Sequence, residues 1–351
     1  MLKKTLVWAP DARGDLVKLL DIFAGHSKNG VLNQQQLVFV IDSRCASIAN
    51  YYGYHYFEIN ARWQRDCSWL VKLLMTCKTS LLLLLAGIVC KKLMVPLLRR
   101  EDKYIVRFLE LLGKKVIYGN VGIENEYSQL LGIATSNLIG EKSNGLGEII
   151  NRQISEISKA ANSKNETNSV YYRASISRLK QTKVTSSRGG ALIVLSGSSP
   201  QKSISHETCE KLSILLDESG TSSEVVEWSR HLNLYLYSNG LPEPRLSSTD
   251  LSITLNYLEQ YALVIVGDSY MAHLVRTDAA KNIMSVVVLN GATSFLYDPN
   301  LQRSRVTPSR SERCPSYPCA NLGGRSCKLE CTPTPEEIVN DCRSLLLLRP
   351  C

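Results

Sequence analysis

The sequence predicts an α/β protein of two domains, each with a parallel β-sheet. The chain has 351 residues, enough for two domains of ordinary size. In both halves, short apolar runs alternate with segments whose leucines recur at helical spacing. Between the halves, about residues 162–190 are polar and carry few large apolar side chains. We expect this linker to close a first domain of residues 1–180, followed by a second of residues 181–351.

The first half opens with a strand, a helix and a second strand. Residues 5–10 form a short apolar run that ends in a Pro-Asp turn. Apolar residues at 16, 19, 20 and 23 predict a helix, and residues 36–42 predict a buried strand. Further along, a helix that includes residues 108–112 is expected before a strand over 113–118.

The most apolar stretch of the chain is Leu81–Cys90. It is too short to cross a bilayer, because a spanning helix needs about 20 apolar residues. We therefore expect a buried helix. The alternative is a patch that lies at a membrane interface, which would suit an enzyme with a lipid-linked acceptor. Basic residues border the stretch on both sides: Lys78, Lys91, Lys92, Arg99, Arg100 and Lys103.

The second half repeats the α/β pattern. Strands are expected over residues 191–195, 261–266 and 284–289. Helical spacing recurs through residues 212–216 and 251–258.

Charge and cysteine content limit the partners and the compartment. The net charge of +9 favours anionic partners, although a solvated basic surface explains it equally well. The start of the chain does not have the pattern of a signal peptide, which indicates a reducing, cytoplasmic location. The eleven cysteines are then expected to be thiols or metal ligands rather than disulfides.

Asp15 is the first candidate catalytic residue. It follows the first strand and stands at the start of the first helix, where ligands of open α/β sheets bind. A carboxylate there can act as a general base toward a hydroxyl group. The structural alternative is a helix cap, a position that Asp favours.

A serine-rich loop follows the strand over residues 191–195. Small residues let a backbone approach phosphate closely, and a lysine can neutralise a diphosphate. A plain surface turn is the alternative. The candidate residues are Ser196, Ser198, Ser199 and Lys202.

A third group follows the strand over residues 261–266 and is expected to open a helix, whose N-terminal N–H groups suit a diphosphate. Its members are Asp268, Ser269, Tyr270, Met271, Ala272 and His273. A capping role for Asp268 and a packing role for His273 are the structural alternatives. After the next strand, Gly291 and Thr293 are further candidates.

A fourth group is a cysteine cluster. Its spacing suits a structural site for iron or zinc, with free or disulfide-linked thiols as the alternative. The four cysteines, spread over eighteen residues, are Cys314, Cys319, Cys327 and Cys331.

Together these segments resemble the bacterial heptosyltransferases, glycosyltransferase family 9. The family opens with a strand, a Gly-Asp pair and a leucine-rich helix, as at Gly14-Asp15. It carries a small-residue loop before a lysine, and Asp-Ser/Thr-Gly followed two residues later by His-Leu. Lys202 and the segment 268–274 correspond to these positions. A Thr-Pro-Glu-Glu helix start after a Cys-rich loop also matches, at residues 334–337.

The resemblance implies a GT-B fold, in which two Rossmann-like domains with parallel sheets face a central cleft. It implies inverting transfer of a sugar, such as heptose from ADP-heptose, to a hydroxyl of a glycan, lipopolysaccharide core or protein. Asp15 would be the base, and Lys202 with residues 269–272 would stabilise the leaving nucleotide diphosphate. No metal or cofactor is expected in catalysis. The enzyme would be cytoplasmic, with peripheral contact at the inner face of the membrane.

Three departures from the family pattern keep alternatives open. Tyr270 replaces a glycine, Asn290 replaces an aromatic residue, and residues 203–205 replace an aromatic-proline pair. A nucleotide-binding protein of the same fold without activity is therefore one alternative. Another is a metal-binding Cys-loop module that binds nucleic acid. We expect no nucleic-acid partner, because the basic residues are dispersed and no helix-turn-helix or finger is recognisable.

Overall fold

The computed structural model divides the chain into two compact units, residues 1–177 and 178–351. It describes residues 2–9, 13–59, 69–96, 102–118, 150, 154–155, 189–195, 202–228, 233–238, 241–247, 250–290, 301–308 and 332–347. The linker expected over residues 162–190 lies outside these ranges, except for its last two residues.

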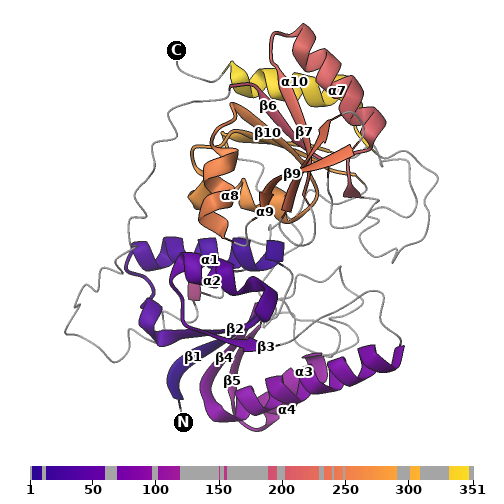
Figure 1. The fold of residues 1–351 in the computed structure, drawn as a ribbon. Helices are drawn as coiled ribbons and strands as arrows, with labels where there is room; N and C mark the ends of the chain where they lie inside the picture. Colours follow the sequence, from indigo (N-terminus) through magenta and orange to yellow (C-terminus); the bar gives the residue numbers. More distant parts are fainter. Residues whose placement is uncertain are drawn as a thin grey trace. The chain divides into compact units, whose positions relative to one another are not determined.

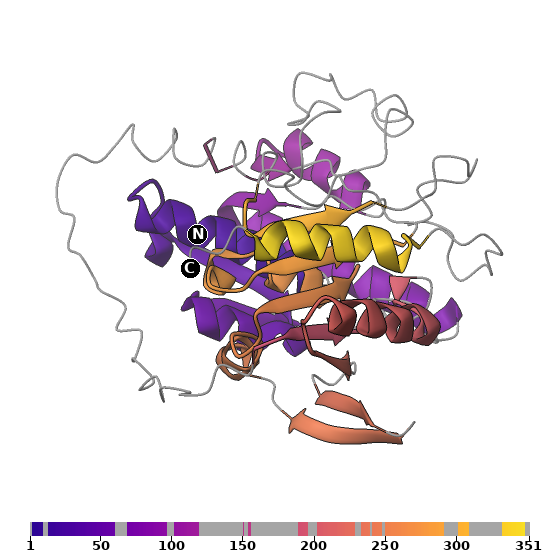
Figure 2. The same cartoon turned by 90° about the horizontal axis from the view of Figure 1, so that it is seen from above.

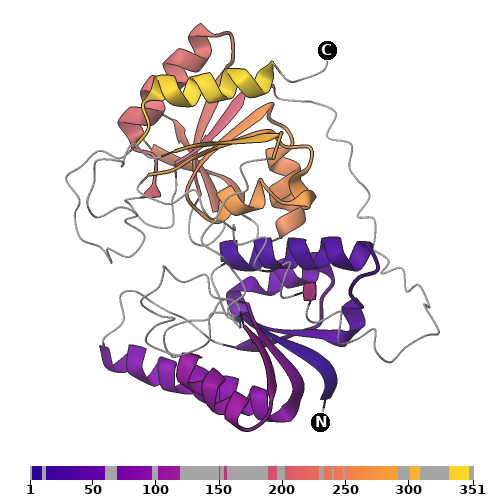
Figure 3. The ribbon, with the colours of Figure 1, turned by 180° about the vertical axis from the view of Figure 1, so that it is seen from behind.

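The first unit contains a five-stranded parallel sheet in the order β3-β2-β1-β4-β5. Its strands are β1 (Leu2–Ala9), β2 (Leu37–Asp42), β3 (Tyr56–Ile59), β4 (Cys90–Val95) and β5 (Lys115–Tyr118). Its helices are α1 (Arg13–Lys28), α2 (Ala46–Tyr52), α3 (Trp69–Val89) and α4 (Asp102–Leu111). Helices α1 and α2 cover one face of the sheet, and α3 and α4 cover the other (Figure 1 and, from behind, Figure 3).

Both faces of this sheet are buried, which explains why its central strands are apolar without alternation. Leu6 and Trp8 of β1 pack in one cluster with Leu83 of α3. On the opposite face, Phe39 of β2 contacts Phe23 of α1, with ring centroids 5.4 Å apart. The helical spacing read from the sequence thus corresponds to the buried side of α1.

Helix α3 departs from the sequence-based expectation. It has 21 residues and begins at Trp69, twelve residues before the apolar stretch recognised in the sequence. The expectation of a buried helix is wrong, because Leu81 and Leu85 are 56% and 49% exposed while Leu83 is buried. A helix that packs on a sheet buries one stripe, so a helix that is apolar all round leaves the other stripe exposed. By length and composition α3 could also cross a membrane, and it is the single such helix within the described ranges.

The second unit contains a seven-stranded sheet in the order β12-β11-β10-β6-β7-β8-β9. Its strands are β6 (Ala191–Val194), β7 (Ser223–Trp228), β8 (Asn233–Ser238), β9 (Leu241–Ser247), β10 (Leu263–Gly267), β11 (Ser285–Val288) and β12 (Ser304–Thr307). Its helices are α7 (His206–Glu218), α8 (Leu251–Leu258), α9 (Tyr270–Leu274) and α10 (Pro335–Leu346). Five strands are parallel, whereas β8 and β9 add antiparallel strands at one edge, seen from above in Figure 2. This antiparallel edge was not predicted from the sequence.

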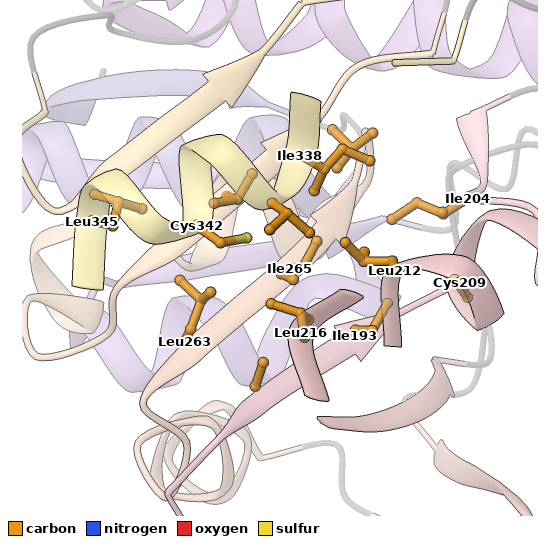
Figure 4. Packing of buried hydrophobic residues seen from close by; sticks show 14 of the residues in the cluster. Ile193, Ile204, Cys209, Leu212, Leu216, Leu263, Ile265, Ile338, Cys342 and Leu345 are labelled. Carbon is orange, nitrogen blue, oxygen red and sulfur yellow. The ribbon is translucent and has the colours of Figure 1, made fainter. Parts of the chain in front are cut away.

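The core of the second unit lies between its sheet and the helices α7 and α10 (Figure 4). Ile193 and Ile265 project from adjacent strands toward Leu212 of α7 and Cys342 of α10. Helix α10 begins with a capping box, in which the side chains of Thr334 and Glu337 bond each other's backbone N–H groups. The Thr-Pro-Glu-Glu segment is therefore a helix start, as its sequence predicted.

Five cysteines fall within the described ranges, and all five are free thiols: Cys45, Cys77, Cys90, Cys209 and Cys342. Burial raises the pKa of Cys209 and of Cys342 to about 12, so these two thiols stay protonated at neutral pH. The four clustered cysteines lie outside the described residues, and the metal site remains a prediction.

Truncation of Ile265 tests whether the β10 side of this core holds the second unit together. Ile265→Ala removes a buried side chain from the centre of the sheet and is expected to cost about 2–5 kcal/mol of unfolding free energy. Ile214→Ala, at a position 57% exposed on α7, should change it by less than about 0.5 kcal/mol. Urea unfolding followed by circular dichroism measures both. Equal midpoints for the two variants would contradict the packing described.

Candidate functional site

The candidate site of the second unit lies at the carboxyl edge of its parallel sheet. From β6 the chain crosses to β7 on one side, while β10, on the other side of β6, leads on to β11. The two connections therefore diverge between β6 and β10. Such a switch point leaves a crevice beyond the strand ends, where open α/β sheets bind their ligands.

A segment after β6, residues 202–204, crosses the end of β10. The Ile204 N–H donates to the Leu195 carbonyl at 3.0 Å, which fixes the segment to the end of its own strand. A Cβ atom on Gly267 would stand 2.7 Å from the Lys202 carbonyl oxygen. Because that atom belongs to the backbone, only glycine at position 267 allows this approach.

The close approach brings together two residues that the sequence nominated separately. The Lys202 Nζ lies 2.6 Å from the Asp268 Oδ2. The lysine side chain is 24% exposed and the aspartate 4% exposed, so the carboxylate anchors an ammonium that still reaches solvent. A pre-positioned, partly exposed ammonium at the edge of a parallel sheet is suited to binding an anion.

Asn290 reaches the same segment from the end of β11. Its Nδ2 donates to the Ser203 carbonyl at 3.5 Å, a long and weak hydrogen bond. Asn290 stands at a position where the family that the sequence resembles has an aromatic residue. In the structure its amide lies over the segment that carries Lys202.

Helix α9 has only five residues, so its dipole is small. The Ser269 hydroxyl accepts the Met271 N–H at 3.2 Å and satisfies one of the N-terminal donors. The side chains of Met271 and Ala272 are buried, so any contact they make with a ligand comes from the backbone. His273 is also buried, whereas Tyr270 is partly exposed.

Arg303, which sequence reasoning missed, braces the chain that follows α9. Its Nη1 donates to the Val275 carbonyl at 2.6 Å, and its Nη2 donates to the Thr277 carbonyl at 2.6 Å. One guanidinium thus satisfies carbonyls at the carboxyl end of the helix. An arginine directly before a short strand carries no signal of this role in the sequence.

Asp15 belongs to the first unit and lies in the first turn of α1, directly beyond β1. The switch point of that sheet lies between β1 and β4. Asp15 therefore follows the carboxyl end of a strand at the switch point of its own sheet, the kind of position that Lys202 and Asp268 have in the second unit. Its side chain is partly buried.

Asp42, at the end of β2, is a second and fully buried carboxylate. It accepts the Arg44 Nε at 2.7 Å and the Arg44 backbone N–H at 2.9 Å, which makes it a structural cap.

The remaining nominated residues lie outside the described ranges. They are Ser196, Ser198, Ser199, Gly291, Thr293, Cys314, Cys319, Cys327 and Cys331. Their roles stay predictions.

A methyl group at position 267 tests the approach of the 202–204 segment. Gly267→Ala is expected to displace this segment and lower the unfolding free energy by about 1–3 kcal/mol, because a backbone oxygen occupies the space required. Amide hydrogen exchange should accelerate at Ile204. Gly25→Ala, where a Cβ meets nothing within 4 Å, is the control and should not destabilise the protein. Unchanged exchange at Ile204 in Gly267→Ala would show that the segment does not depend on this glycine.

No protein-family model matches the chain, and a search of curated protein sequences finds no match. Solved structures do match. Escherichia coli heptosyltransferase WaaC with ADP is 14% identical, covers 86% of this chain and 92% of its own, and gives a TM-score of 0.53. A family 9 glycosyltransferase from Veillonella parvula is 12% identical, covers 99% of both chains and gives 0.54. Escherichia coli ADP-heptose lps heptosyltransferase II is 12% identical, covers 98% of both chains and gives 0.51. The chain therefore has the GT-B fold of these glycosyltransferases, built from two Rossmann-like units, which confirms the fold expected from the sequence.

Proposed function

We propose that this protein is a glycosyltransferase that moves a sugar from a nucleotide diphosphate donor to an acceptor hydroxyl. One observation carries the proposal: Lys202, anchored by Asp268, stands at the switch point of the second sheet. The shared fold gives independent support, because WaaC of this fold was solved with ADP and with ADP-2-deoxy-2-fluoro heptose.

The donor we propose is ADP-heptose or a close analogue, on the basis of those neighbours. The acceptor class is a hydroxyl on a glycan, a lipopolysaccharide core or a protein. A lipid-linked acceptor would place the enzyme at the inner face of a membrane, in peripheral contact with it.

The proposed reaction inverts the anomeric centre. The acceptor oxygen attacks the anomeric carbon and forms the new glycosidic bond, while the bond from that carbon to the diphosphate oxygen breaks with its electron pair. Asp15 takes the hydroxyl proton as the oxygen attacks. Lys202 neutralises charge that develops on the departing diphosphate, so no step is routed through a metal ion.

The ion pair suits this role of Lys202 for an electrostatic reason. Without a ligand, the ammonium has the Asp268 carboxylate as a partner and is held in one place. Binding of a diphosphate then adds a second anion on the exposed side of the same ammonium. The lysine needs little reorganisation, which is the condition for efficient electrostatic stabilisation of a leaving group.

A second candidate is a nucleotide-binding protein that does not transfer sugar. It is favoured by Tyr270, which is partly exposed where the resembling family has a glycine, because a tyrosine adds a bulky side chain at a position where a glycine leaves the backbone open to a ligand. This candidate keeps the binding role of Lys202 but not the catalytic role of Asp15. It is distinguished by nucleotide binding without turnover.

Removal of the Lys202 charge tests donor binding. Lys202→Met is expected to weaken ADP binding by about 10- to 100-fold, as for a lost charged hydrogen bond. Lys202→Met with Asp268→Asn avoids a buried unpaired carboxylate and should show the same loss. Lys211→Met, which breaks only an exposed pair with Glu207, is the matched control and should bind ADP normally. Calorimetric titration measures all four proteins, and normal binding by the folded double variant would remove Lys202 from the site.

Neutralisation of Asp15 tests the transfer step. Asp15→Asn keeps the side-chain shape and is expected to lower turnover by about 10²- to 10⁴-fold while ADP affinity stays unchanged. Asp21→Asn, on the same helix, keeps an oxygen for the Tyr52 hydroxyl and is the control. Release of nucleotide diphosphate is followed from ADP-heptose and from UDP-, GDP- and dTDP-sugars, in the presence of a glycan extract.

The outcomes separate the two candidates. Extract-dependent release that collapses in Asp15→Asn supports the transferase and identifies the donor. Nucleotide binding with no release from any donor favours the binding protein. Absence of both binding and release, in a folded protein, contradicts the proposed function.

A further inference from the structure

Helix α3 carries an apolar stripe along its exposed side. Residues at positions 70, 74, 81, 85 and 88 recur on one face of a helix with 100° per residue. The stripe extends over about 27 Å at 1.5 Å per residue. All five side chains are exposed: Leu70, Leu74, Leu81, Leu85 and Ile88.

Helix α4 carries a shorter stripe of the same kind. It consists of Tyr104, Phe108 and Leu111, which lie on one face of the helix at spacing i, i+4 and i+7. Tyr104 is 77% exposed and Leu111 is 79% exposed. The buried residues of α4, Val106 and Leu109, lie on the opposite side.

The two stripes lie on the outer side of one helical layer. Helix α3 buries Thr79 and Leu83 on the side opposite its stripe. Gly87 of α3 is in close contact with Leu109 of α4, so the helices pack directly against each other. In both helices the exposed stripe is thus turned away from the sheet. We name these eight exposed residues of α3 and α4 the α3–α4 outer face.

The segments that contain these two helices and the strands after them are rich in basic residues. Residues 69–96 and 102–118 contain eight basic residues and two acidic ones. The basic ones are Lys72, Lys78, Lys91, Lys92, Lys103, Arg107, Lys114 and Lys115; the acidic ones are Asp102 and Glu110. Between residues 69 and 96 no acidic residue occurs.

Four lysines gather at the carboxyl end of α3, beside the last residues of its stripe. The Lys114 Nζ donates to the Ile88 carbonyl at 2.6 Å, and Lys92 and Lys115 are partners in the pairing of β4 with β5. Burial lowers the pKa of Lys92, and the charges of Lys115 and Lys91 lower it further. Lys91, Lys92, Lys114 and Lys115 form what we call the basic cluster.

We propose that the α3–α4 outer face docks onto an anionic lipid bilayer, with its apolar side chains in the interface and the basic cluster at the lipid phosphates. An apolar helical face bordered by lysines is the composition that binds membrane surfaces in plane. Helix α3 lies on the membrane rather than across it, because Leu83 belongs to the core of the first unit.

The inference rests on the proposed function in one respect only: membrane binding would give the enzyme access to a lipid-linked acceptor. The face belongs to the first unit, whereas Lys202 and Asp268 belong to the second. Binding to lipid can therefore be measured without a donor or an acceptor.

The test is co-sedimentation of the full chain with vesicles of phosphatidylcholine alone or with added phosphatidylglycerol. We expect binding to the anionic vesicles only, released by high salt. Leu74→Ser with Leu81→Ser and Leu85→Ser should reduce partitioning about tenfold per leucine. Lys91→Gln with Lys115→Gln should reduce it about fivefold per lysine. Ile214→Ser and Lys211→Gln, exposed positions of the second unit, are the matched controls and should not change it.

Circular dichroism and light scattering accompany each measurement. No sedimentation of the folded wild type with anionic vesicles overturns the proposal, as does equal sedimentation of the triple leucine variant. A dimer that the triple variant abolishes, without vesicle binding, assigns the face to a second copy and also overturns it. Vesicle binding without sugar transfer leaves this inference standing while the proposed function fails. Sugar transfer to a soluble acceptor without vesicle binding overturns this inference, while the proposed function stands.

Discussion

The passage of residues 202–204 over Gly267 fixes the geometry of the second unit's site. The missing side chain lets the Lys202 carbonyl oxygen lie 2.7 Å from the position that a Cβ atom would take, which is closer than a real Cβ atom allows. Because Asp268 follows Gly267 directly, the same approach places its carboxylate against the Lys202 ammonium. The Ile204 N–H then ties the segment back to the end of β6. One steric condition therefore sets both the backbone path and the position of the charge pair.

The sequence predicted the individual residues of this site, but it did not predict which of them contact one another. Both Lys202 and Asp268 follow apolar strands, and the carboxyl ends of parallel strands share one edge, so a common location could be expected. Their ion pair depends on β6 and β10 being neighbours, which is a property of strand order. Strand order arises from long-range packing and has no local periodicity in the sequence. The start of α10 was predictable because Thr334, Pro335 and Glu337 act within one helical turn.

Other features could not be predicted from the sequence, and a physical reason can be given for each. A helix made of leucines gives the same hydropathy whether one side or all sides are buried, so the exposed Leu81 and Leu85 required the packing of α3 to be known. Arg303 acts on carbonyls that are distant in sequence and common to every residue type. Asn290 was read as a departure from a family pattern, and its contact with Ser203 depends on the path of the 202–204 segment.

The distribution of charge gives the excess of basic residues a structural meaning. In the second unit Lys202 is held by a buried carboxylate, which stabilises one position for the ammonium. In the first unit burial lowers the pKa of Lys92, and the neighbouring charges of Lys115 and Lys91 lower it further, an arrangement that costs free energy in the isolated protein. Exposed leucines on α3 carry a similar cost in water. A surface that is unfavourable in both respects becomes favourable when anionic phosphates and an apolar phase cover it together, because one partner then removes both penalties.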